Sequence, residues 1–382
     1  MGKMETIGTD VVIVGGGLMG CSAALDLSRK GRSVVVLERG FVGAQASGVN
    51  FGLLRRQDRF LPQLPLANRA VEIWHRLENV VGEDCEVEIR GHLRFALDDE
   101  DMAVIEDYAA GAREYDFEIE ILGGETLRRR WPWLSDRVVG AGWSPDDGVA
   151  NPRLVTPAYA RAARAAGADI REEHEAVEMT HDGGGFRIVT QNGLEVRASI
   201  MLNTAGAWSH HVSANFGEPV PLTAIGPPEA VTEPVPYFIE PTIQRVGSPV
   251  VVRQVQRGNV IIAGKPRGIA DNVTNRAYVA PRSTLANMRK ALEVVPSLGS
   301  LNLIRVWSGI EAALPDNLPV LGPSLTTPGL FHAFGFSGHG FQIGPAVGVV
   351  LSELAIDGRT ETPIEPFTMG RFADYEGEGS DA

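Results

Sequence analysis

A glycine-rich turn near the N-terminus constrains the fold of this 382-residue chain most strongly. Residues 10–15 read Asp-Val-Val-Ile-Val-Gly, which is typical of a buried parallel strand, and a helix is expected over 18–29. The turn between them, residues 15–20, satisfies the pattern Gly-x-Gly-x-x-Gly in the strand-to-helix context that gives this pattern its meaning. A second apolar run over 33–38 completes a β-α-β unit. The chain therefore opens with a dinucleotide-binding fold.

Each glycine of the turn has its own physical role. Gly15 permits the tight turn, Gly17 lets the backbone approach a pyrophosphate, and Gly20 allows the helix to pack closely on the strand. The helix begins at Leu18 and Met19, so a phosphate would lie at its positive N-terminal end. These five residues are predicted to contact a dinucleotide cofactor.

Glu38 favours two cofactors over a third. It lies at the end of the second strand, followed by Arg39, at the distance from Gly15 that this motif requires. A carboxylate there accepts hydrogen bonds from both ribose hydroxyls and repels a 2′-phosphate, which disfavours NADP. A structural glycine turn beside a surface glutamate is the simpler alternative. FAD and NAD remain open.

Charge and cysteine content narrow the functional class. There are 48 acidic and 35 basic residues, a net charge of −13, which opposes nucleic-acid binding through bulk charge. No membrane-spanning apolar run and no N-terminal signal region are expected. Cys21 and Cys85 are too few for a disulfide framework, so a cytoplasmic location is expected. The pair His210-His211 has the wrong spacing for ligands on one helix face, and no metal site is predicted.

The loop after Glu38 separates FAD from NAD. Residues 43–52 are small and polar, and Ser47 and Asn50 within them are hydrogen-bond donors suited to a second phosphate and a ribityl chain. A nicotinamide dehydrogenase would instead continue with further β-α-β crossovers. An ordinary surface loop has a similar composition, so this segment favours FAD without excluding the alternative.

Several separated motifs, taken together, resemble one family. They are residues 15–20, Glu38, the 46–52 loop, Asn203-Thr204-Ala205-Gly206-Ala207-Trp208-Ser209, Pro315-Asp316 with Pro319–Gly322, and Gly335-Phe336-Ser337-Gly338-His339-Gly340. In this order they are similar to the D-amino-acid oxidase superfamily of FAD-dependent amine oxidoreductases. The likeness spans the chain and is sharpest over 10–56, 198–212 and 305–358. Within the superfamily, residues 305–316 and 331–336 most resemble the catalytic flavin subunits of opine oxidases. Sarcosine oxidase β, proline and hydroxyproline dehydrogenases and cyanide-synthase flavin subunits are close to them.

The resemblance implies an α/β architecture with two interleaved domains. A Rossmann-like FAD-binding domain, of the type also found in glutathione reductase, is expected from residues 1–60, 145–215 and 305–382. A substrate-binding domain with a mixed or antiparallel sheet is expected from residues 61–144 and 216–304.

The resemblance also implies further cofactor contacts. It places the backbone of residues 338–342 against the flavin pyrimidine edge, followed by a helix expected over 345–356. Relatives with covalent flavin have a cysteine near Gly309, which is absent here, so FAD is expected to bind non-covalently. The implied contact residues are Ala46, Ser47, Asn50, Phe51, Gly52, Leu53, Val177, Ala205, Gly206, Trp208, Gly309, Gly338, His339, Gly340, Phe341 and Gln342.

The chemistry implied is oxidation of a C–N bond in an amine or N-substituted amino acid, opine-like, sarcosine-like or an imino acid. The product is an imine, and a hydride passes to flavin N5. His339 is a candidate acid or base, with a packed loop residue as the alternative. Lys265 is a weaker candidate: some relatives use a lysine to activate O2, but this one does not sit clearly in that motif.

Glu311 departs from the family pattern. Relatives that bind small α-amino acids often carry an arginine there, which holds the substrate carboxylate, and a glutamate cannot do so. Either Arg55, Arg56 or Arg253 takes that role, or the substrate presents a cationic group to Glu311. The alternative is a Glu311 side chain that points away in a salt bridge.

Other functions stay open from the sequence. They are an NAD-dependent dehydrogenase, a D-amino-acid or hydroxyproline dehydrogenase that passes electrons to a carrier, and an FAD-binding subunit that needs a partner for activity. The opine-oxidase likeness raises a hetero-oligomer with another cofactor-carrying subunit, because two cysteines cannot ligate an iron–sulfur cluster. The expected ligand is a small-molecule amine or amino acid.

Overall fold

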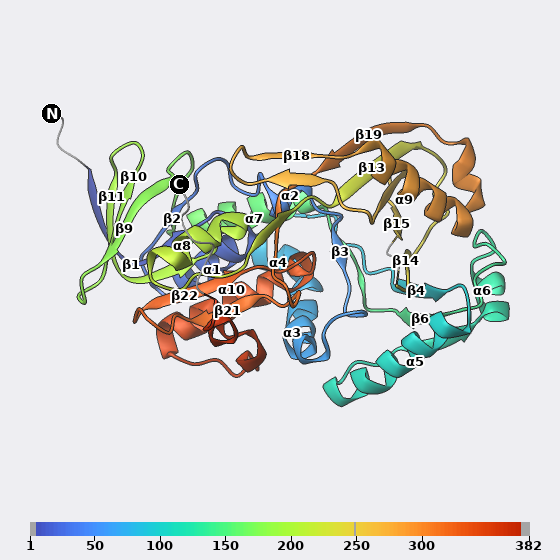
Figure 1. The fold of residues 1–382 in the computed structure, drawn as a ribbon, viewed down its shortest axis with the longest axis horizontal. Coiled ribbons are helices and arrows are strands. Elements are labelled where there is room, and N and C mark those ends of the chain that lie inside the picture. The colour runs from blue at the N-terminus through green and yellow to red at the C-terminus, as the bar shows by residue number, and fades with distance from the viewer. Residues whose placement is uncertain (1–4, 248–249, 376–382) are drawn as a thin grey trace.

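A computed structural model describes residues 5–247 and 250–375. Two sheets, each with its own helices, form two lobes that lie side by side (Figure 1). The lobe that holds β1, β2, β11 and β22 is on the left of the view, and the lobe that holds β4, β6, β13 and β14 is on the right. Segments far apart in the sequence alternate between the lobes.

The first sheet is mostly parallel and carries the glycine-rich turn. Its central pairs, β1–β2, β1–β11, β2–β8 and β11–β22, are parallel, and β21 is antiparallel at one edge. Residues 11–14 and 34–37 are buried because helices or strands cover both faces. In spatial order the strands are β21 (Val320–Pro323), β22 (Leu330–Phe334), β11 (Glu195–Asn203), β1 (Thr6–Val14), β2 (Val34–Leu37) and β8 (Asp169–Arg171).

Three helices accompany this sheet: α1 (Leu18–Arg29), α7 (Pro152–Ala165) and α10 (Gly340–Asp357). The helix α3 (Leu64–Trp74) packs on α10. The Rossmann-like expectation is confirmed.

A meander extends the first sheet. The strands β9 (Ala176–His181) and β10 (Phe186–Thr190) pair antiparallel with one another, and β10 pairs with β11. The sequence pattern predicts this meander but divides its last strand near residue 199, whereas β11 runs unbroken. Its first half pairs with β10 and its last three residues pair with β22. One strand therefore joins the meander to the parallel core.

The second sheet is mixed, as expected for the substrate-binding domain. Only β14–β4 is parallel among its pairs in the described residues, and the others are antiparallel. Helix α9 (Pro281–Val294) packs on it. The expected domain boundary at 305 falls inside β19. In order the strands are β19 (Leu303–Ser308), β13 (Pro228–Pro234), β16 (Asn259–Gly264), β15 (Val250–Gln254), β14 (Thr242–Arg245), β4 (His92–Ala96), β6 (Gly140–Ser144) and β5 (Glu120–Gly123).

Short elements connect or flank the sheets. The two-residue strand β3 lies between the lobes in Figure 1 and pairs with β7. The helices are α2 (Ala46–Val49), α4 (Leu77–Val81), α5 (Asp99–Ala112), α6 (Gly124–Arg130) and α8 (Ser209–Asn215). The strands are β3 (Leu53–Leu54), β7 (Gly148–Val149), β12 (Thr223–Ile225), β17 (Ile269–Asp271), β18 (Arg276–Tyr278) and β20 (Glu311–Ala313).

Two helix predictions need correction. The helix expected over 345–356 begins at Gly340, because Pro345 lies in its second turn and does not mark its start. The helix predicted over 66–81 is divided into α3 and α4 around His75 and Arg76. Proline is tolerated in α10 because only one hydrogen bond of its ladder is lost there.

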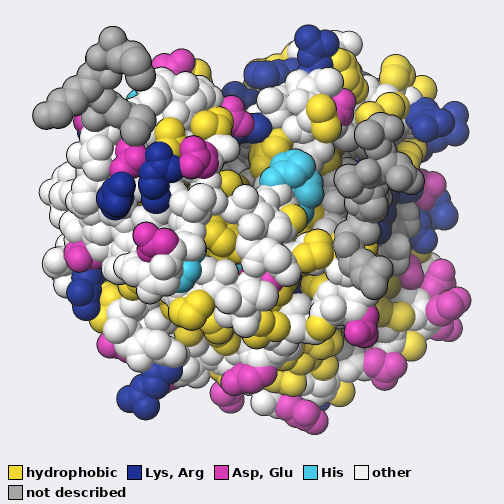
Figure 2. All heavy atoms as spheres, turned by 60° about the vertical axis from the view of Figure 1, so that its left-hand side comes forward, with side chains coloured by type: hydrophobic (Ala, Val, Ile, Leu, Met, Phe, Trp, Pro, Cys, Tyr) yellow, Lys and Arg dark blue, Asp and Glu magenta, His cyan; other side chains and the backbone are white. Residues whose placement is uncertain are grey.

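No helix in residues 5–247 or 250–375 is long and apolar enough to cross a membrane. On the face shown in Figure 2, basic side chains occur singly or in small groups among acidic ones. That face presents no broad basic surface of the kind that nucleic-acid binding requires.

Helices α1 and α10 approach one another closely. A Cβ atom added at Gly348 would lie 2.5 Å from Ser22 Cβ, and one added at Gly340 would lie 3.0 Å from Met19 Cε. The Ser22 hydroxyl donates a hydrogen bond to the carbonyl of Pro345, at 3.0 Å. The start of α1 therefore lies beside the start of α10, and both N-termini open at the same end of the sheet.

Replacing the contact glycine tests this packing. Gly348→Ala places a methyl group where the backbone and side chain of α1 leave no space, so it should lower the free energy of unfolding by about 1–3 kcal/mol. Urea unfolding at a fixed FAD concentration measures the change. Gly8→Ala is the matched control, because nothing lies within 4 Å of an added Cβ there, and it should cost no more than about 0.5 kcal/mol. Equal losses in both variants would contradict the role of close packing.

Candidate active site

One cavity of about 390 Å³ collects most of the motifs that the sequence singles out. Its lining comes from the first turn, the loop after β2, the segment after β11 and the start of α10, with additions from the second sheet. The predicted residues in the lining are Gly15, Gly17, Leu18, Met19, Glu38, Arg39, Ala46, Ser47, Asn50, Phe51, Gly52, Leu53, Arg55, Ala205, Gly206, Trp208, Glu311, Gly338, His339, Gly340, Phe341 and Gln342.

Four predicted residues lie outside this lining. Val177 is 59% exposed on β9, although its neighbour Ala176 does line the cavity. A Cβ on Gly309 would lie 2.2 Å from Val49 Cγ2, so this glycine packs beneath the loop. Lys265 contributes only its carbonyl, which accepts a hydrogen bond from Lys290 Nζ at 2.9 Å. The fourth, Gly20, is a packing residue, as its predicted role requires.

The backbone of the first turn requires its glycines. Gly15 has φ of +110°, and an added Cβ would lie 2.4 Å from the Thr204 carbonyl oxygen. A Cβ on Gly20 would lie 2.1 Å from the Gly15 carbonyl oxygen. Since no larger residue fits either position, the turn holds the end of β1, the segment after β11 and the start of α1 together.

Two helix N-termini face the cavity without charged caps. No side chain caps α1 at Gly17 or α10 at His339, and neither helix has an acidic residue in its first turn. The only side-chain contact at the start of α1 is from the Leu18 N–H to the Ser47 hydroxyl oxygen, at 3.0 Å. Unpaired N–H groups at a helix start attract negative charge. The cavity therefore has two places suited to anionic groups, both provided by backbone.

Glu38 lies where a ribose diol would be recognised. Its two carboxylate oxygens accept hydrogen bonds from the N–H groups of Gly16 and Gly40, each at 2.8 Å. Each oxygen has a further lone pair for a ribose hydroxyl. Beside it, the Arg39 guanidinium stacks on Trp208, 3.5 Å from the ring centroid. These groups suit the adenosine half of a dinucleotide.

Asn50 has a different role from the one expected. Its amide donates to the carbonyls of Ala46 and Ser47, and its oxygen accepts from the Gly52 N–H. The side chain therefore holds the loop in shape. The Ser47 hydroxyl accepts from Leu18 and keeps its own proton for donation.

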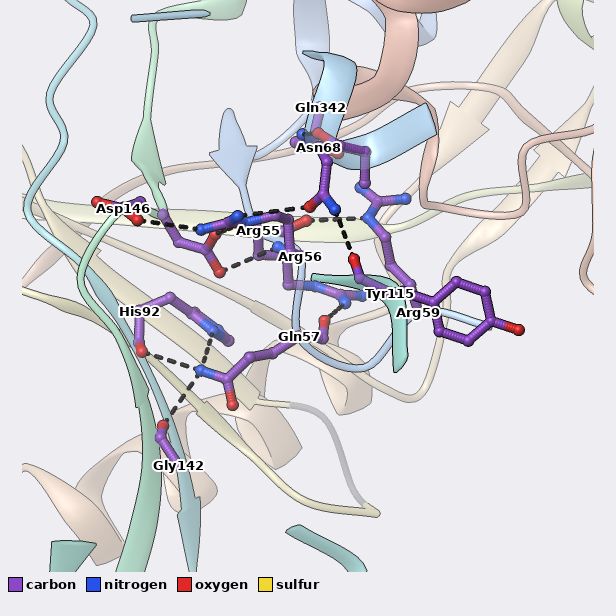
Figure 3. A network of polar contacts seen from close by, with 12 residues as sticks. Arg55, Arg56, Gln57, Arg59, Asn68, His92, Tyr115, Gly142, Asp146 and Gln342 are labelled. Atoms are coloured by element: carbon purple, nitrogen blue, oxygen red, sulfur yellow. Dashed lines mark hydrogen bonds and ion pairs between the residues drawn. The ribbon is translucent and has the colours of Figure 1, made fainter. Parts of the chain in front are cut away.

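A buried arginine segment forms the basic wall of the cavity (Figure 3). Arg55 Nη2 lies 3.4 Å from His339 Nδ1, and Arg59 Nη1 donates to the His339 carbonyl at 3.0 Å. Arg56 points elsewhere, because its Nε and its N–H both bind the buried Asp147 carboxylate. Of the two arginines proposed here from the sequence, only Arg55 reaches the cavity.

Arg59 is a site residue that the sequence motifs do not single out. Burial and the nearby charge of Arg55 lower its pKa to about 9. A signal is nevertheless present, because a run with three arginines in five residues follows directly after the cofactor loop. The remaining polar member of the run, Gln57, is held by the carbonyls of His92 and Gly142. The segment therefore links the second sheet to the start of α10.

His339 is neutral at pH 7. Burial, followed by the charges of Arg55 and Arg59, lowers its pKa well below the ordinary value. Because the Arg55 guanidinium can only donate, the contact with Nδ1 requires a lone pair there and places the proton on Nε2. The imidazole is thus not a cationic acid.

Two carboxylates line the cavity on the side of the second sheet. Glu311 Oε2 is buried without a hydrogen-bond partner, and within the described residues its carboxylate has no ion pair within 4.0 Å. Burial raises its pKa to about 7, with Arg267 acting in the opposite direction. Glu229, which is 4% exposed, likewise has an unpartnered Oε2. Glu311 therefore does not point away in a salt bridge.

Glu229 is a second site residue without a sequence motif. Burial raises its pKa well above the ordinary value, Arg253 partly offsets this effect, and Glu311 adds to it. Its only signal is a charged residue within the apolar run of β13. Arg253, the third arginine proposed from the sequence, does not line the cavity and lies over the Phe51 ring, 5.3 Å from the centroid.

The fold and cavity define a dinucleotide-binding protein of the doubly wound type, and comparison with known proteins identifies its family. Residues 10–354 match the family of FAD dependent oxidoreductases, and the chain belongs to that family. FAD is therefore its cofactor, and the lining residues fit it: glycines that no larger residue could replace, a carboxylate at the end of β2 and two uncapped helix starts.

Individual relatives cover nearly the whole chain. Glycine oxidase from Geobacillus kaustophilus is 25% identical over 95% of this chain and 97% of its own length. A subunit of opine oxidase from Rhizobium meliloti is 26% identical over 97% and 99%. The crystal structure of L-proline dehydrogenase from P. horikoshii superposes with a TM-score of 0.90, covering 98% of this chain and all of its own, at 24% identity. The fold of this chain is thus that of known FAD-dependent oxidoreductases.

The unpaired Glu311 carboxylate predicts an unusual pH dependence of stability. Its pKa is about 7 in the folded chain and 4.5 ordinarily, so the folded chain binds more protons between these values and stability falls as pH rises through them. Glu311→Gln carries no charge to bury. Relative to the native chain, it should gain stability from pH 5 to pH 8, reaching about 1–3 kcal/mol. Urea unfolding at each pH measures this; a pH-independent difference would contradict the assignment.

Proposed function

We propose that this protein oxidises the C–N bond of a secondary amine or N-substituted amino acid to an imine. The observation that carries the proposal is the Arg55–His339 pair, which lies in one cavity with the uncapped start of α10. Relatives named as glycine, opine and sarcosine oxidases support the same reaction class. Bound FAD supplies the hydride acceptor at N5.

The proposed cofactor site uses the lining residues described above. The turn at 15–20 and the start of α1 hold the pyrophosphate, and Glu38 holds the adenosine ribose. The start of α10, residues 338–342, stabilises negative charge on the pyrimidine edge of the flavin. We retain Val177 and Gly309 only as backbone contacts. The division into an FAD-binding domain (1–60, 145–215, 305–382) and a substrate-binding domain (61–144, 216–304) is part of this proposal, supported by the two sheets.

The chain's own side chains bind and orient the substrate. Arg55 donates from Nη1 to the Gln57 carbonyl, while its Nη2 makes only long contacts with Asp58 and His339. Nη2 therefore keeps donor capacity for a substrate carboxylate. His339 lies beside Arg55 and so positions the guanidinium. Because His339 stays neutral, it adds no positive charge that would oppose removal of hydride from the substrate. Lys265 has no side chain in the lining, and we assign it no step.

A partner subunit is part of the proposal. The opine oxidase relative and the hydrogen cyanide synthase protein HcnC are both named as subunits, and the match to each covers almost the whole of this chain. We infer that a second, cofactor-carrying subunit accepts electrons from the flavin. A cytoplasmic location is favoured by the two buried, unpaired cysteines.

Anaerobic reduction of the bound flavin tests the proposed reaction. Sarcosine, glycine, proline isomers, D-amino acids and opines are added singly, and loss of the flavin visible absorbance is followed. We expect one class of secondary amine to reduce the flavin fully. Arg55→Met should raise the concentration of a carboxylate-bearing substrate needed for half-maximal rate on the order of 10- to 100-fold.

The matched control is Arg113→Met, which removes an exposed arginine paired with Glu118. It should leave both the rate and the concentration dependence unchanged. Failure of every amine to reduce the flavin, with or without co-expressed partner, would overturn the proposed reaction. An Arg55→Met variant with unchanged concentration dependence would remove Arg55 from substrate binding.

A further inference from the structure

We propose that Glu229 and Glu311 form an anionic subsite that binds a second, positively charged group of the substrate, separate from the nitrogen that is oxidised. This inference rests on the proposed function and specifies its substrate class. The substrates are N-substituted amino acids whose side chain ends in an ammonium or guanidinium group.

The first observation is that both carboxylates are unsatisfied in one cavity. Glu229 lies on β13 and Glu311 on β20, and both line the cavity. Each has an inaccessible Oε2 atom without a hydrogen-bond partner, and Glu229 is 4% exposed. Buried ionisable groups normally have partners, because burying an unpaired one is costly. Two such groups facing one ligand cavity indicate that a ligand provides the partner.

The nearby cations of the chain do not satisfy them. Arg253 is close enough to influence Glu229 electrostatically, and Arg267 to influence Glu311, yet within the described residues neither forms an ion pair within 4.0 Å with these carboxylates. Arg253 stacks on Phe51, outside the lining. The two carboxylates also repel each other, so an incoming cation relieves both burial and repulsion.

The second observation is the position of this acidic pair relative to the basic wall. Glu311 Oε2 lies 3.7 Å from where a Cβ on Gly338 would stand, and the next residue, His339, contacts Arg55. The segment 338–339 therefore has a carboxylate on one side and a guanidinium on the other. Such a cavity matches a molecule with a carboxylate and a separate cationic group.

The chemistry separates this group from the reacting amine. An amine gives up hydride from its neighbouring carbon only when its nitrogen lone pair is free, so the reacting nitrogen has to be unprotonated. Two carboxylates beside that nitrogen would favour its protonated form. They are instead suited to a nitrogen that stays charged throughout, such as a primary ammonium or a guanidinium.

A pair of probes that differ in one charge tests the subsite. Racemic N-α-methyl-lysine and N-α-methyl-norleucine share the reacting amine, the carboxylate and the chain, and differ in a terminal ammonium against a hydrogen. Anaerobic titration of the holoenzyme measures binding from the shift of the flavin spectrum and reduction from its bleaching. We expect the lysine probe to bind on the order of 10- to 100-fold more tightly.

Matched variants locate the effect. Glu311→Gln and Glu229→Gln should each abolish most of this preference while changing the affinity of the norleucine probe by less than about threefold. Glu125→Gln, whose side chain is 92% exposed on α6, is the control and should retain the full preference. A gain in stability of Glu311→Gln alongside weaker binding of the lysine probe would separate a binding role from a structural one.

The outcomes distinguish the two proposals. Equal binding of both probes, or equal loss of both in the glutamine variants, would overturn the subsite even if sarcosine still reduces the flavin. Loss of FAD from the glutamine variants would also overturn it, because the carboxylates would then belong to the cofactor site. Selective binding of the lysine probe without bleaching by any amine would support the subsite and contradict the proposed reaction.

Discussion

The close packing of α1 on α10 is the interaction on which the site depends. Small residues on both helices let them approach, and the hydrogen bond from Ser22 to the Pro345 carbonyl holds them in register. The two helices come from opposite ends of the chain, yet their N-termini open into one cavity. As a result, the places for a pyrophosphate and for the anionic edge of a reduced flavin are built from backbone dipoles of one rigid unit.

The second sheet adds what this unit lacks, namely charge on side chains. The Arg55–Arg59 segment reaches from that sheet to His339, and it is held there by carbonyl groups and by Asp147. Burial keeps His339 neutral and leaves Glu311 unpaired with a pKa of about 7. The cavity thus combines a permanent cation with two carboxylates whose charge depends on what they bind. This division explains how residues that define a substrate can differ between relatives while the cofactor site stays the same.

Much of the cofactor half is predictable from sequence, because its requirements are local. A glycine turn, a strand-end glutamate and a small polar loop each have a physical signature within a few residues. The sequence places the start of α10 five residues too late, because Pro345 is a helix-start signal that tertiary packing overrides. The sequence also predicts Asn50 as a donor to the cofactor, whereas its side chain satisfies its own loop.

The substrate half is harder to predict because its residues meet only in three dimensions. Glu311 is unusual from its position in a motif, but its direction depends on burial and on its neighbours. Glu229 and Arg59 have no motif at all. A glutamate in an apolar strand and an arginine-rich run after a cofactor loop become informative only once both sheets are placed around one cavity. Choosing among Arg55, Arg56 and Arg253 likewise requires the positions of Asp147 and Phe51.

The most direct test of this site is a crystal structure of the holoenzyme with FAD bound. We expect the adenosine ribose on Glu38, the pyrophosphate at the start of α1 and the N1–C2=O edge of the flavin at the start of α10. We also expect Arg55, Glu229 and Glu311 to remain uncovered around a space beside N5. A flavin ring that covers Glu229 and Glu311, or that leaves the start of α10 without contact, would contradict the proposed arrangement.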